Sequence, residues 1–540
     1  MLESDQAGAE ALFDGRITFG TAGLRASMGP GPKQMNRLVV RQTTAGVMSW
    51  LPDGATVVIG YDARHDSATY AQEVAAVVGA AGGHALVLPA PLPTPVLAYA
   101  VLDRRADAGV MITASHNPAA DNGYKLYLGD GIQLVDPADA EIAAAITAVA
   151  ARHDQSIAGL VASDGSEGPI SPEAGTIVTL DEAMAARHLQ AAVAACRGQD
   201  REVKTLYTAM HGVGGRHLLA AFAAAGCPPP VVVDGQFDPG PDFSTVAFPN
   251  PEEPGALDLA FATAQEEADA GRPVDVILAN DPDADRLGVA IPDRHGIWTR
   301  LSGDQVGVLL ADHLLGHSSG PDRLVASSLV SSRLITAMAE DVGATSIRTL
   351  TGFKWVARPI VERPKDHYLL GYEEALGYCV GDRVRDKDGI SAALVMAELV
   401  AETVAAGETL WDRLDHLAQR HGVYLTAPVT LVFAGTGGSE RRQRLLQQVQ
   451  SSPPIELAGV EITGSEDLSL GHDLPPASGL IWHLADRSRV VIRPSGTEPK
   501  LKAYLEVIEP IGQSSPADAQ QRAASRMAAL ESAVSALFAV

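Results

Sequence analysis

The stretch Ile112-Thr113-Ala114-Ser115-His116-Asn117-Pro118 is the starting point for interpreting this chain. It overlaps the apolar run Val110-Met111-Ile112, which favours a β-strand, and Asn117-Pro118 is typical of a turn. Ser115 is therefore expected where a strand ends. In an open α/β sheet this edge is where ligands bind, so the hydroxyl is expected to face a cleft. Taken alone, the stretch is also compatible with a polar turn.

A second stretch, Asp281-Pro282-Asp283-Ala284-Asp285-Arg286, joins two strand-like runs at residues 274–279 and 287–291. Three alternating carboxylates repel one another unless they share a cation, and an all-oxygen set suits Mg²⁺. An EF-hand is excluded, because its sixth and twelfth positions would be Arg286 and Pro292 here. An Asp-x-Asp nucleophile of the haloacid dehalogenase type and a solvated acidic loop are the alternatives.

A third stretch, Arg493-Pro494-Ser495-Gly496-Thr497, follows a strand-like run at residues 489–492. Arg493 offers a bidentate donor, Ser495 and Thr497 offer hydroxyls, and Gly496 lets the backbone approach an anion closely. The chemistry indicates a phosphate-binding loop; a polar turn closing a hairpin is the alternative.

These three stretches resemble the α-D-phosphohexomutase family, which contains phosphoglucomutase and phosphomannomutase. Three further stretches carry the same resemblance, which spans residues 19 to 500: Phe19-Gly20-Thr21-Ala22-Gly23-Leu24-Arg25, Asp121-Asn122-Gly123-Tyr124-Lys125 and Gly371-Tyr372-Glu373-Glu374-Ala375-Leu376-Gly377-Tyr378. The last of these, with Thr351-Gly352-Phe353-Lys354-Trp355, looks like the branch of the family that includes pentose-active members.

The resemblance implies a role for each matching residue. Ser115 would carry a phosphoryl group, and the catalytic set would be Ser115, Lys125, Arg25 and His116. One Mg²⁺ ion would be held by Asp281, Asp283, Asp285 and an oxygen on phosphorylated Ser115. The substrate would contact Arg286, Thr351, Gly352, Lys354, Glu373, Lys387, Arg493, Ser495, Gly496 and Thr497.

Two departures from the family pattern are visible. Pro282 stands where glycine is common, which affects no ligand. Ala375 stands where many members have a serine that contacts a sugar hydroxyl, so the preferred sugar is left open.

The expected fold class is α/β, because strands and helices alternate along most of the chain. We expect three mixed α/β sandwich domains of similar topology and a smaller C-terminal α+β domain around a central cleft. The predicted domains are residues 1–180, 181–300, 301–424 and 425–540.

Composition narrows the class of protein. The 540 residues are 46 % hydrophobic and 20 % charged, as in ordinary globular proteins, and too many for one core. The net charge of −25 argues against nucleic acid and anionic membranes as partners. No signal peptide or long apolar run is apparent, and three widely spaced cysteines indicate no disulfide framework, so a cytoplasmic location is expected.

The expected activity is interconversion of hexose 1-phosphate and hexose 6-phosphate, with glucose preferred and mannose next. It would proceed through a phosphoserine enzyme and a hexose 1,6-bisphosphate, which also serves as activator. The alternatives are a phosphopentomutase, a sugar-phosphate-binding protein without turnover and a metal-dependent phosphatase. A monomer or a homodimer is expected.

Overall fold

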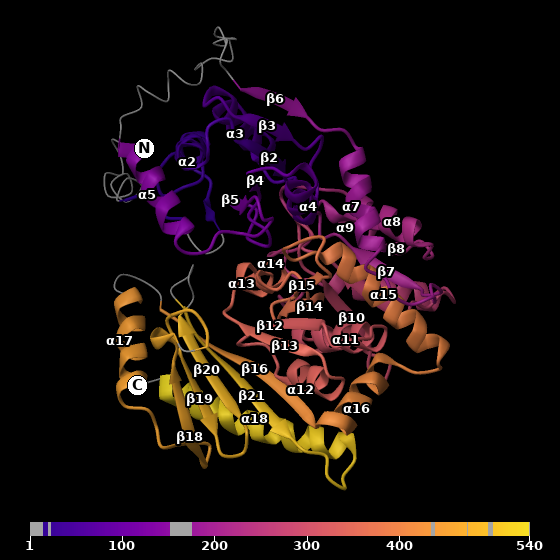
Figure 1. The fold of residues 1–540 in the computed structure, drawn as a ribbon. Helices are drawn as coiled ribbons and strands as arrows, with labels where there is room; N and C mark the ends of the chain where they lie inside the picture. Colours follow the sequence, from indigo (N-terminus) through magenta and orange to yellow (C-terminus); the bar gives the residue numbers. More distant parts are fainter. Residues whose placement is uncertain are drawn as a thin grey trace.

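The computed structural model describes residues 15–19, 23–151, 175–433, 438–471, 473–494 and 500–538. Within these residues the chain forms four β-sheets in sequence order, with the first at the top of Figure 1 and the fourth at the lower left. Ser495, Gly496 and Thr497 of the predicted phosphate loop lie outside the described residues.

The first sheet has the strand order β1-β5-β4-β2-β3-β6, and β2, β3, β4 and β6 run parallel. Its strands are β1 (Leu24–Ser27), β2 (Thr56–Tyr61), β3 (His84–Val87), β4 (Ala108–Ile112), β5 (Asp121–Leu128) and β6 (Thr176–Thr179). The accompanying helices are α2 (Arg37–Trp50), α3 (Ser67–Ala80), α4 (Thr94–Arg104) and α5 (Ala138–Ala151). Parallel strands joined by helices are the expected α/β pattern.

The second sheet has the order β11-β10-β9-β7-β8. Its strands are β7 (Thr205–Thr208), β8 (Val231–Val232), β9 (Val276–Ala279), β10 (Gly288–Pro292) and β11 (Trp298–Arg300). Its helices are α7 (Ala183–Val193), α8 (Gly214–Ala225), α9 (Asp234–Phe237) and α10 (Asp258–Asp269).

The third sheet has the order β13-β12-β14-β15. Its strands are β12 (Arg323–Ser328), β13 (Thr345–Thr349), β14 (His367–Glu373) and β15 (Gly377–Val380). Its helices are α11 (Gly303–Gly316), α12 (Leu334–Asp341), α13 (Phe353–Val356), α14 (Arg358–Glu362), α15 (Gly389–Ala405) and α16 (Leu410–His421).

The fourth sheet is antiparallel, with the order β16-β21-β20-β19-β18-β17. Its strands are β16 (Val423–Val432), β17 (Glu456–Leu457), β18 (Val460–Asp467), β19 (Leu480–Leu484), β20 (Arg489–Pro494) and β21 (Lys500–Glu509). The 3-10 helix η1 (Leu468–Leu470) and the helices α17 (Gly438–Ser451) and α18 (Pro516–Phe538) accompany it. The structure therefore confirms the mixed fold class, with an α+β unit at the C-terminal end.

The second and third sheets share one hydrophobic core. Leu278 on β9 and Phe222 on α8 belong to the same buried cluster as Leu309 on α11 and Leu394 on α15. The first and fourth sheets have separate cores of their own. Helix α15 is buried along nearly its whole length and packs against α7, α8 and α11, so it joins the two central sheets (Figure 1).

Helix length and hydropathy bear on membrane insertion. Among the described residues, no single helix is long and apolar enough to cross a bilayer. The bent pair Gly389–Ala405 and Leu410–His421 passes by length and composition alone, with an 89° bend between the two helices.

Candidate active site

The serine loop begins directly after β4. Ser115 is buried and adopts a left-handed backbone conformation with φ of +53°, which is uncommon for a residue with a side chain. The Ser115 backbone N–H donates to Thr113 Oγ1 over 2.9 Å, and the Thr113 hydroxyl donates to Asp62 Oδ2 over 2.6 Å. The strained backbone is thus held by its neighbours, as is typical at functional sites.

A buried arginine fixes the rest of this loop. The guanidinium of Arg64 donates to the carbonyl oxygens of Ser115 and Asn117 over 2.6 Å each and to that of Pro118 over 2.8 Å. Asp62 lies 3.3 Å from the same guanidinium and balances its charge. The serine loop is therefore preorganised by the turn that follows the neighbouring parallel strand β2.

The acidic loop lies against the serine. The Ser115 hydroxyl donates to Asp281 Oδ2 over 2.7 Å, although the two residues are 166 positions apart in sequence. Asp281, Asp283 and Asp285 are fully buried, and one oxygen of each lies within 4.8 Å of the others. The Oδ1 atoms of Asp283 and Asp285 are buried without a hydrogen-bond partner in the described part of the chain. Such unpaired buried oxygens are what a divalent cation would satisfy, so these residues suit Mg²⁺.

Three cationic side chains surround the carboxylates. Lys125 Nζ donates to Asp283 Oδ2 over 2.6 Å and to Asp285 Oδ2 over 2.8 Å. Lys387 Nζ lies 2.9 Å from Asp285 Oδ2. Burial alone would raise the pKa of Asp285, but Lys125, Lys387 and Arg286 outweigh it and hold that pKa below its usual value. Asp285 therefore remains ionised.

Asp281 has a different electrostatic environment. Burial, followed by the charges of Asp285 and Asp283, raises the pKa of Asp281 to about 8 in the metal-free site, despite the opposing charge of Arg286. The backbone N–H of Arg286 also donates to Asp281 Oδ1 over 3.0 Å.

His116 Nδ1 lies 3.3 Å from Ser115 Oγ, and burial together with Arg286 and Arg25 keeps the pKa of His116 well below its usual value. His116 is therefore a neutral imidazole beside the serine.

The predicted sugar-binding residues meet at Glu373, at the end of β14. Glu373 Oε1 accepts the Gly352 N–H over 2.6 Å. Burial raises the pKa of Glu373, and the Gly352 N–H, Lys387, Arg286 and Arg493 all act in the opposite direction. The Glu373 carboxylate is therefore close enough to interact electrostatically with predicted substrate contacts that belong to the second, third and fourth sheets.

Three further predicted residues lie at the edges of this group. Lys354 is buried, and its Nζ lies 3.7 Å from Asp139 Oδ2 on α5, so it bridges the first and third sheets. Arg25 lies on β1 opposite Gly123, and its Nε is buried without a hydrogen bond among the described residues. Thr351, directly before Gly352, is partly buried.

Comparison with known proteins identifies the family. Four sequence models of phosphoglucomutase/phosphomannomutase match this chain: alpha/beta/alpha domain I at residues 16–153, domain II at 186–296, domain III at 302–421 and the C-terminal domain at 476–510. A "Probable phosphomannomutase" of Haemophilus influenzae is 40 % identical over 479 residues, covering 87 % of this chain and 93 % of that protein. The chain belongs to the phosphoglucomutase/phosphomannomutase family.

Other relatives of this mutase differ in the sugar that their names give. A human "Phosphopentomutase" is 33 % identical over 560 residues, covering 96 % of this chain and 89 % of that protein. A "Phosphoglucomutase" of Staphylococcus aureus is 31 % identical over 515 residues, covering 92 % and 90 %. The protein is accordingly an isomerase of the phosphotransferase type in the α-D-phosphohexomutase superfamily, which acts on sugar phosphates.

A solved structure agrees with the fold. A putative phosphomannomutase from Thermus thermophilus superposes with a TM-score of 0.70 at 22 % identity, covering 97 % of this chain and 100 % of that one. At this identity the likeness shows that the mutase has the phosphohexomutase fold. Members of the family use a metal ion, typically Mg²⁺, and the acidic cluster of this mutase offers the oxygens for one.

Sequence reasoning missed several residues that support the site of this mutase. Asp62, Arg64 and Thr113 hold the serine loop, and the Thr94 hydroxyl donates to Asp283 Oδ2 over 2.5 Å. The sequence pattern could have indicated Asp62 and Arg64. They come directly after the strand-like run at residues 56–60, in the same way that Ser115 comes after the strand-like run at residues 110–112.

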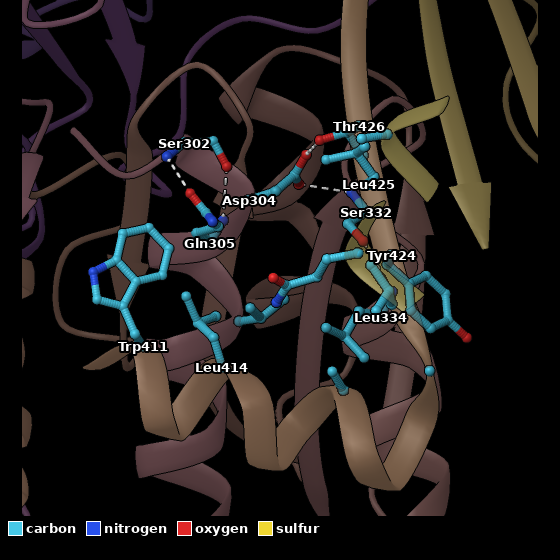
Figure 2. Close-up of a pocket in the computed structure, with 16 residues that line it drawn as sticks. Ser302, Asp304, Gln305, Ser332, Leu334, Trp411, Leu414, Tyr424, Leu425 and Thr426 are labelled. Carbon is cyan, nitrogen blue, oxygen red and sulfur yellow. Dashed lines mark hydrogen bonds between the residues drawn. The ribbon is translucent and has the colours of Figure 1, made fainter. Parts of the chain in front are cut away.

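A cavity of about 390 Å³ lies between α11, α16 and the start of β16, and none of the predicted site residues lines it. Figure 2 shows Asp304 at its upper edge, where the Oδ1 atom accepts the Ser332 N–H over 2.7 Å and the Oδ2 atom accepts the Thr426 hydroxyl over 2.7 Å. Because Thr426 belongs to the fourth sheet, Asp304 joins that sheet to the third.

Proposed function

We propose that this mutase interconverts hexose 1-phosphate and hexose 6-phosphate, with glucose preferred and mannose next, through a phosphorylated Ser115. The observation that carries the proposal is the 2.7 Å contact between Ser115 Oγ and Asp281, which puts a buried nucleophile against the acidic loop. Relatives named phosphomannomutase and phosphoglucomutase support the hexose assignment.

In the proposed reaction, phosphorylated Ser115 gives its phosphoryl group to the free hydroxyl of the sugar phosphate. The bond between phosphorus and Ser115 Oγ breaks, a bond to the sugar oxygen forms, the sugar hydroxyl loses its proton and Ser115 Oγ regains one. The hexose 1,6-bisphosphate then turns over in the cleft and returns its other phosphoryl group to Ser115 by the reverse of these steps. The reaction therefore needs no water and no net proton.

The side chains around Ser115 divide the work. Mg²⁺ bound by Asp281, Asp283 and Asp285 would supply Lewis-acid stabilisation of the charge on the phosphoryl group. Lys125 would stabilise negative charge on the transferring phosphoryl group, because its ammonium lies beside the serine and donates to two carboxylates there. Asp281 Oδ2 accepts a hydrogen bond from the Ser115 hydroxyl in the unphosphorylated enzyme, and neutral His116 lies 3.3 Å from the same serine oxygen.

The far side of the cleft is proposed to hold the sugar and the stationary phosphate. Glu373 would accept hydrogen bonds from sugar hydroxyls, since a carboxylate accepts several at once. Arg493 and Lys387, which both act on the pKa of Glu373, would supply positive charge for the phosphate. Enclosure of the site would keep out water, which would otherwise hydrolyse phosphorylated Ser115.

The first experiment tests the phosphoserine. Mass spectrometry of the purified protein is expected to find phosphate on Ser115, and Ser115→Ala is expected to lower kcat by at least about 10⁴-fold. Ser49→Ala is the matched control, because Ser49 is an exposed serine on α2. A Ser115→Ala protein as active as the parent would overturn the proposal.

A phosphopentomutase is the second candidate, because relatives at 33 % and 34 % identity are named phosphopentomutase and phosphoribomutase. Rates with glucose 1-phosphate, mannose 1-phosphate and ribose 1-phosphate decide between the two. A clear preference for ribose 1-phosphate would replace the hexose assignment. Release of inorganic phosphate faster than isomer formation would indicate a phosphatase.

A further inference from the structure

A second group of metal-ligating side chains lies at the C-terminal ends of α11 and α15. His313 and His317 are separated by four positions on or just after α11, and Glu398 and Glu402 by four positions on α15. Side chains at this spacing share one helix face. Ligand atoms of His313, His317 and Glu402 all lie within 4.8 Å of one another. None of these residues belongs to the mutase site.

His313 is the residue that points to a ligand. Its side chain is 0 % exposed, and neither ring nitrogen has a hydrogen bond among the described residues. Its Nδ1 lies 3.4 Å from Glu402 Oε2, and its Nε2 lies 3.5 Å from Glu398 Oε1. Each nitrogen of this fully buried imidazole therefore faces a carboxylate oxygen at more than the usual hydrogen-bond distance, and a buried polar atom without a well-formed hydrogen bond calls for an explanation.

His317 adds a second ring nitrogen that faces Glu402. Its Nδ1 lies 3.0 Å from the carbonyl oxygen of His313, so Nδ1 carries the hydrogen and donates it. The lone pair of Nε2 then faces Glu402 Oε1 at 3.0 Å. Two acceptors at that distance require a proton or a cation between them. A ring nitrogen that donates to a backbone carbonyl is also the usual arrangement of a metal-ligating histidine.

We propose that His313 Nδ1, His317 Nε2 and the Glu402 carboxylate bind a divalent transition-metal ion, with Zn²⁺ as the best match. Zinc bonds of about 2.0–2.1 Å in a tetrahedral site hold neighbouring ligand atoms about 3.3 Å apart. The two nitrogen-to-oxygen distances here are 3.4 Å and 3.0 Å. Two imidazoles and one carboxylate suit Zn²⁺, whereas Mg²⁺ prefers oxygen alone.

Glu398 positions the proposed ligand His313. It lies on the Nε2 side of the ring, opposite the metal, and accepts the backbone N–H of Arg197 at both oxygens, over 2.9 Å and 3.1 Å. A carboxylate held in this way selects the tautomer with a free Nδ1 lone pair. The Cys196 thiol is not counted as a ligand, because its sulfur is not among the ligand atoms that lie within 4.8 Å of one another.

The site is structural and separate from catalysis. Glu402 lies 13 residues beyond the start of α15, about 20 Å along the helix from the end that adjoins the acidic loop. The His317 side chain is 34 % exposed, so the fourth position opens to solvent and is assigned to water. The metal would join the ends of α11 and α15 to the Arg197 turn.

Zinc retention by the full-length protein tests the site. The protein is stripped with a chelator, given Zn²⁺ in a buffer with excess Mg²⁺ to occupy the acidic loop, desalted and analysed for metal. About one zinc per chain is expected to remain. His317→Ala and Glu402→Gln are each expected to lower zinc affinity at least about tenfold. His295→Ala, an exposed histidine outside the cluster, is the matched control.

A second measurement distinguishes the loss of a metal ligand from misfolding of the variant. Co²⁺ in place of Zn²⁺ should give the visible absorption of a tetrahedral site in the parent and in His295→Ala, and not in Glu402→Gln, which retains the shape of the side chain. Melting curves of the metal-free variants report whether they fold. Parent protein that retains no zinc, or variants that retain as much as the parent, would overturn the proposal.

Discussion

Helix α15 connects two clusters of metal-ligating side chains that differ in chemistry. Its first residue, Gly389, donates its N–H to Ala284 O in the acidic loop over 3.2 Å. Its last turns carry Glu398 and Glu402 of the histidine cluster. The acidic cluster offers oxygen alone and is matched by lysine and arginine, whereas the histidine cluster combines imidazole and carboxylate.

The difference explains how one chain can hold two kinds of ion. Mg²⁺ binds weakly to nitrogen, and Zn²⁺ binds well to a mixed set, so the ligand types alone separate the two sites. Burial adds a second difference. All three aspartates are fully buried beside a nucleophile, while His317 reaches the surface. The first cluster is suited to chemistry and the second to joining helices.

Among changes that leave Ser115 in place, removing one charge from the acidic cluster should have the largest effect. Asp285→Asn leaves Lys125 and Lys387 without their shared carboxylate and removes a metal ligand, so kcat is expected to fall about 10²–10³-fold. Steady-state mutase kinetics measure it, with the exposed Asp269→Asn on α10 as the control. A loss below tenfold would mean that the cluster is not the catalytic one.

A smaller effect is expected when a neighbour of the acidic cluster is changed. Thr94→Val keeps the side-chain shape and removes the hydroxyl that donates to Asp283 Oδ2. Because groups that orient metal ligands are worth about 10–100-fold in affinity, the Mg²⁺ concentration for half-maximal activity should rise by that factor. Thr147→Val on the exposed face of α5 is the control. An unchanged Mg²⁺ dependence of activity would show that the Thr94 hydroxyl does not support metal binding.

Acid should weaken the N-terminal end of α15 through a pair of buried histidines. His188 Nε2 lies 3.1 Å from Asp388, which caps α15, and His188 Nδ1 shares a hydrogen with His217 Nε2 over 2.9 Å. Burial, then His188, lowers the pKa of His217 to about 3.

The sign follows from the lowered pKa of His217. Between pH 6.5 and 3 the unfolded chain binds a proton at His217 and the folded chain does not, so stability is complete above pH 6.5 and falls with acidification. The loss attributable to His217 is about 2 kcal/mol at pH 5. Urea midpoints at pH 7.5 and pH 5 should therefore differ less in His217→Gln than in the parent. Equal differences would contradict the assignment.

The smallest effect is expected at a glycine next to the histidine cluster. A Cβ at Gly198 would overlap Glu402 Oε1 and Glu398 Oε1, so both flexible side chains must shift and Glu398 must loosen its hydrogen bonds to the Arg197 N–H. Gly198→Ala should therefore fold, keep its mutase activity with Mg²⁺ and retain zinc about tenfold more weakly. Gly235→Ala is the control, because a Cβ at Gly235 would meet no atom within 4 Å. Gly271→Ala is unsuitable, because the backbone φ of Gly271 is +75°. Unchanged zinc retention would show that the carboxylates need not hold their positions.

The residues of the proposed mutase site could be named from the sequence because they lie in short continuous stretches. Ser115, Asp281, Asp283 and Asp285 each follow a strand, and the pattern of residues is specific enough to name the family. The supporting residues were harder to find, because Arg64 and Thr94 act through single contacts with loops distant in sequence. Roles of individual residues and the domain boundaries at 180, 300 and 424 stay predictions.

The amino-acid sequence by itself determined the α/β class, the serine and acidic loops and the kind of ion that three aspartates suit, because these depend on local order and side-chain chemistry. The tertiary structure decided that Ser115 touches Asp281, that the second and third sheets share a core, and that His313 and His317 meet Glu402. These contacts join residues far apart in the chain, and only the packing of helices and sheets sets the distances between them.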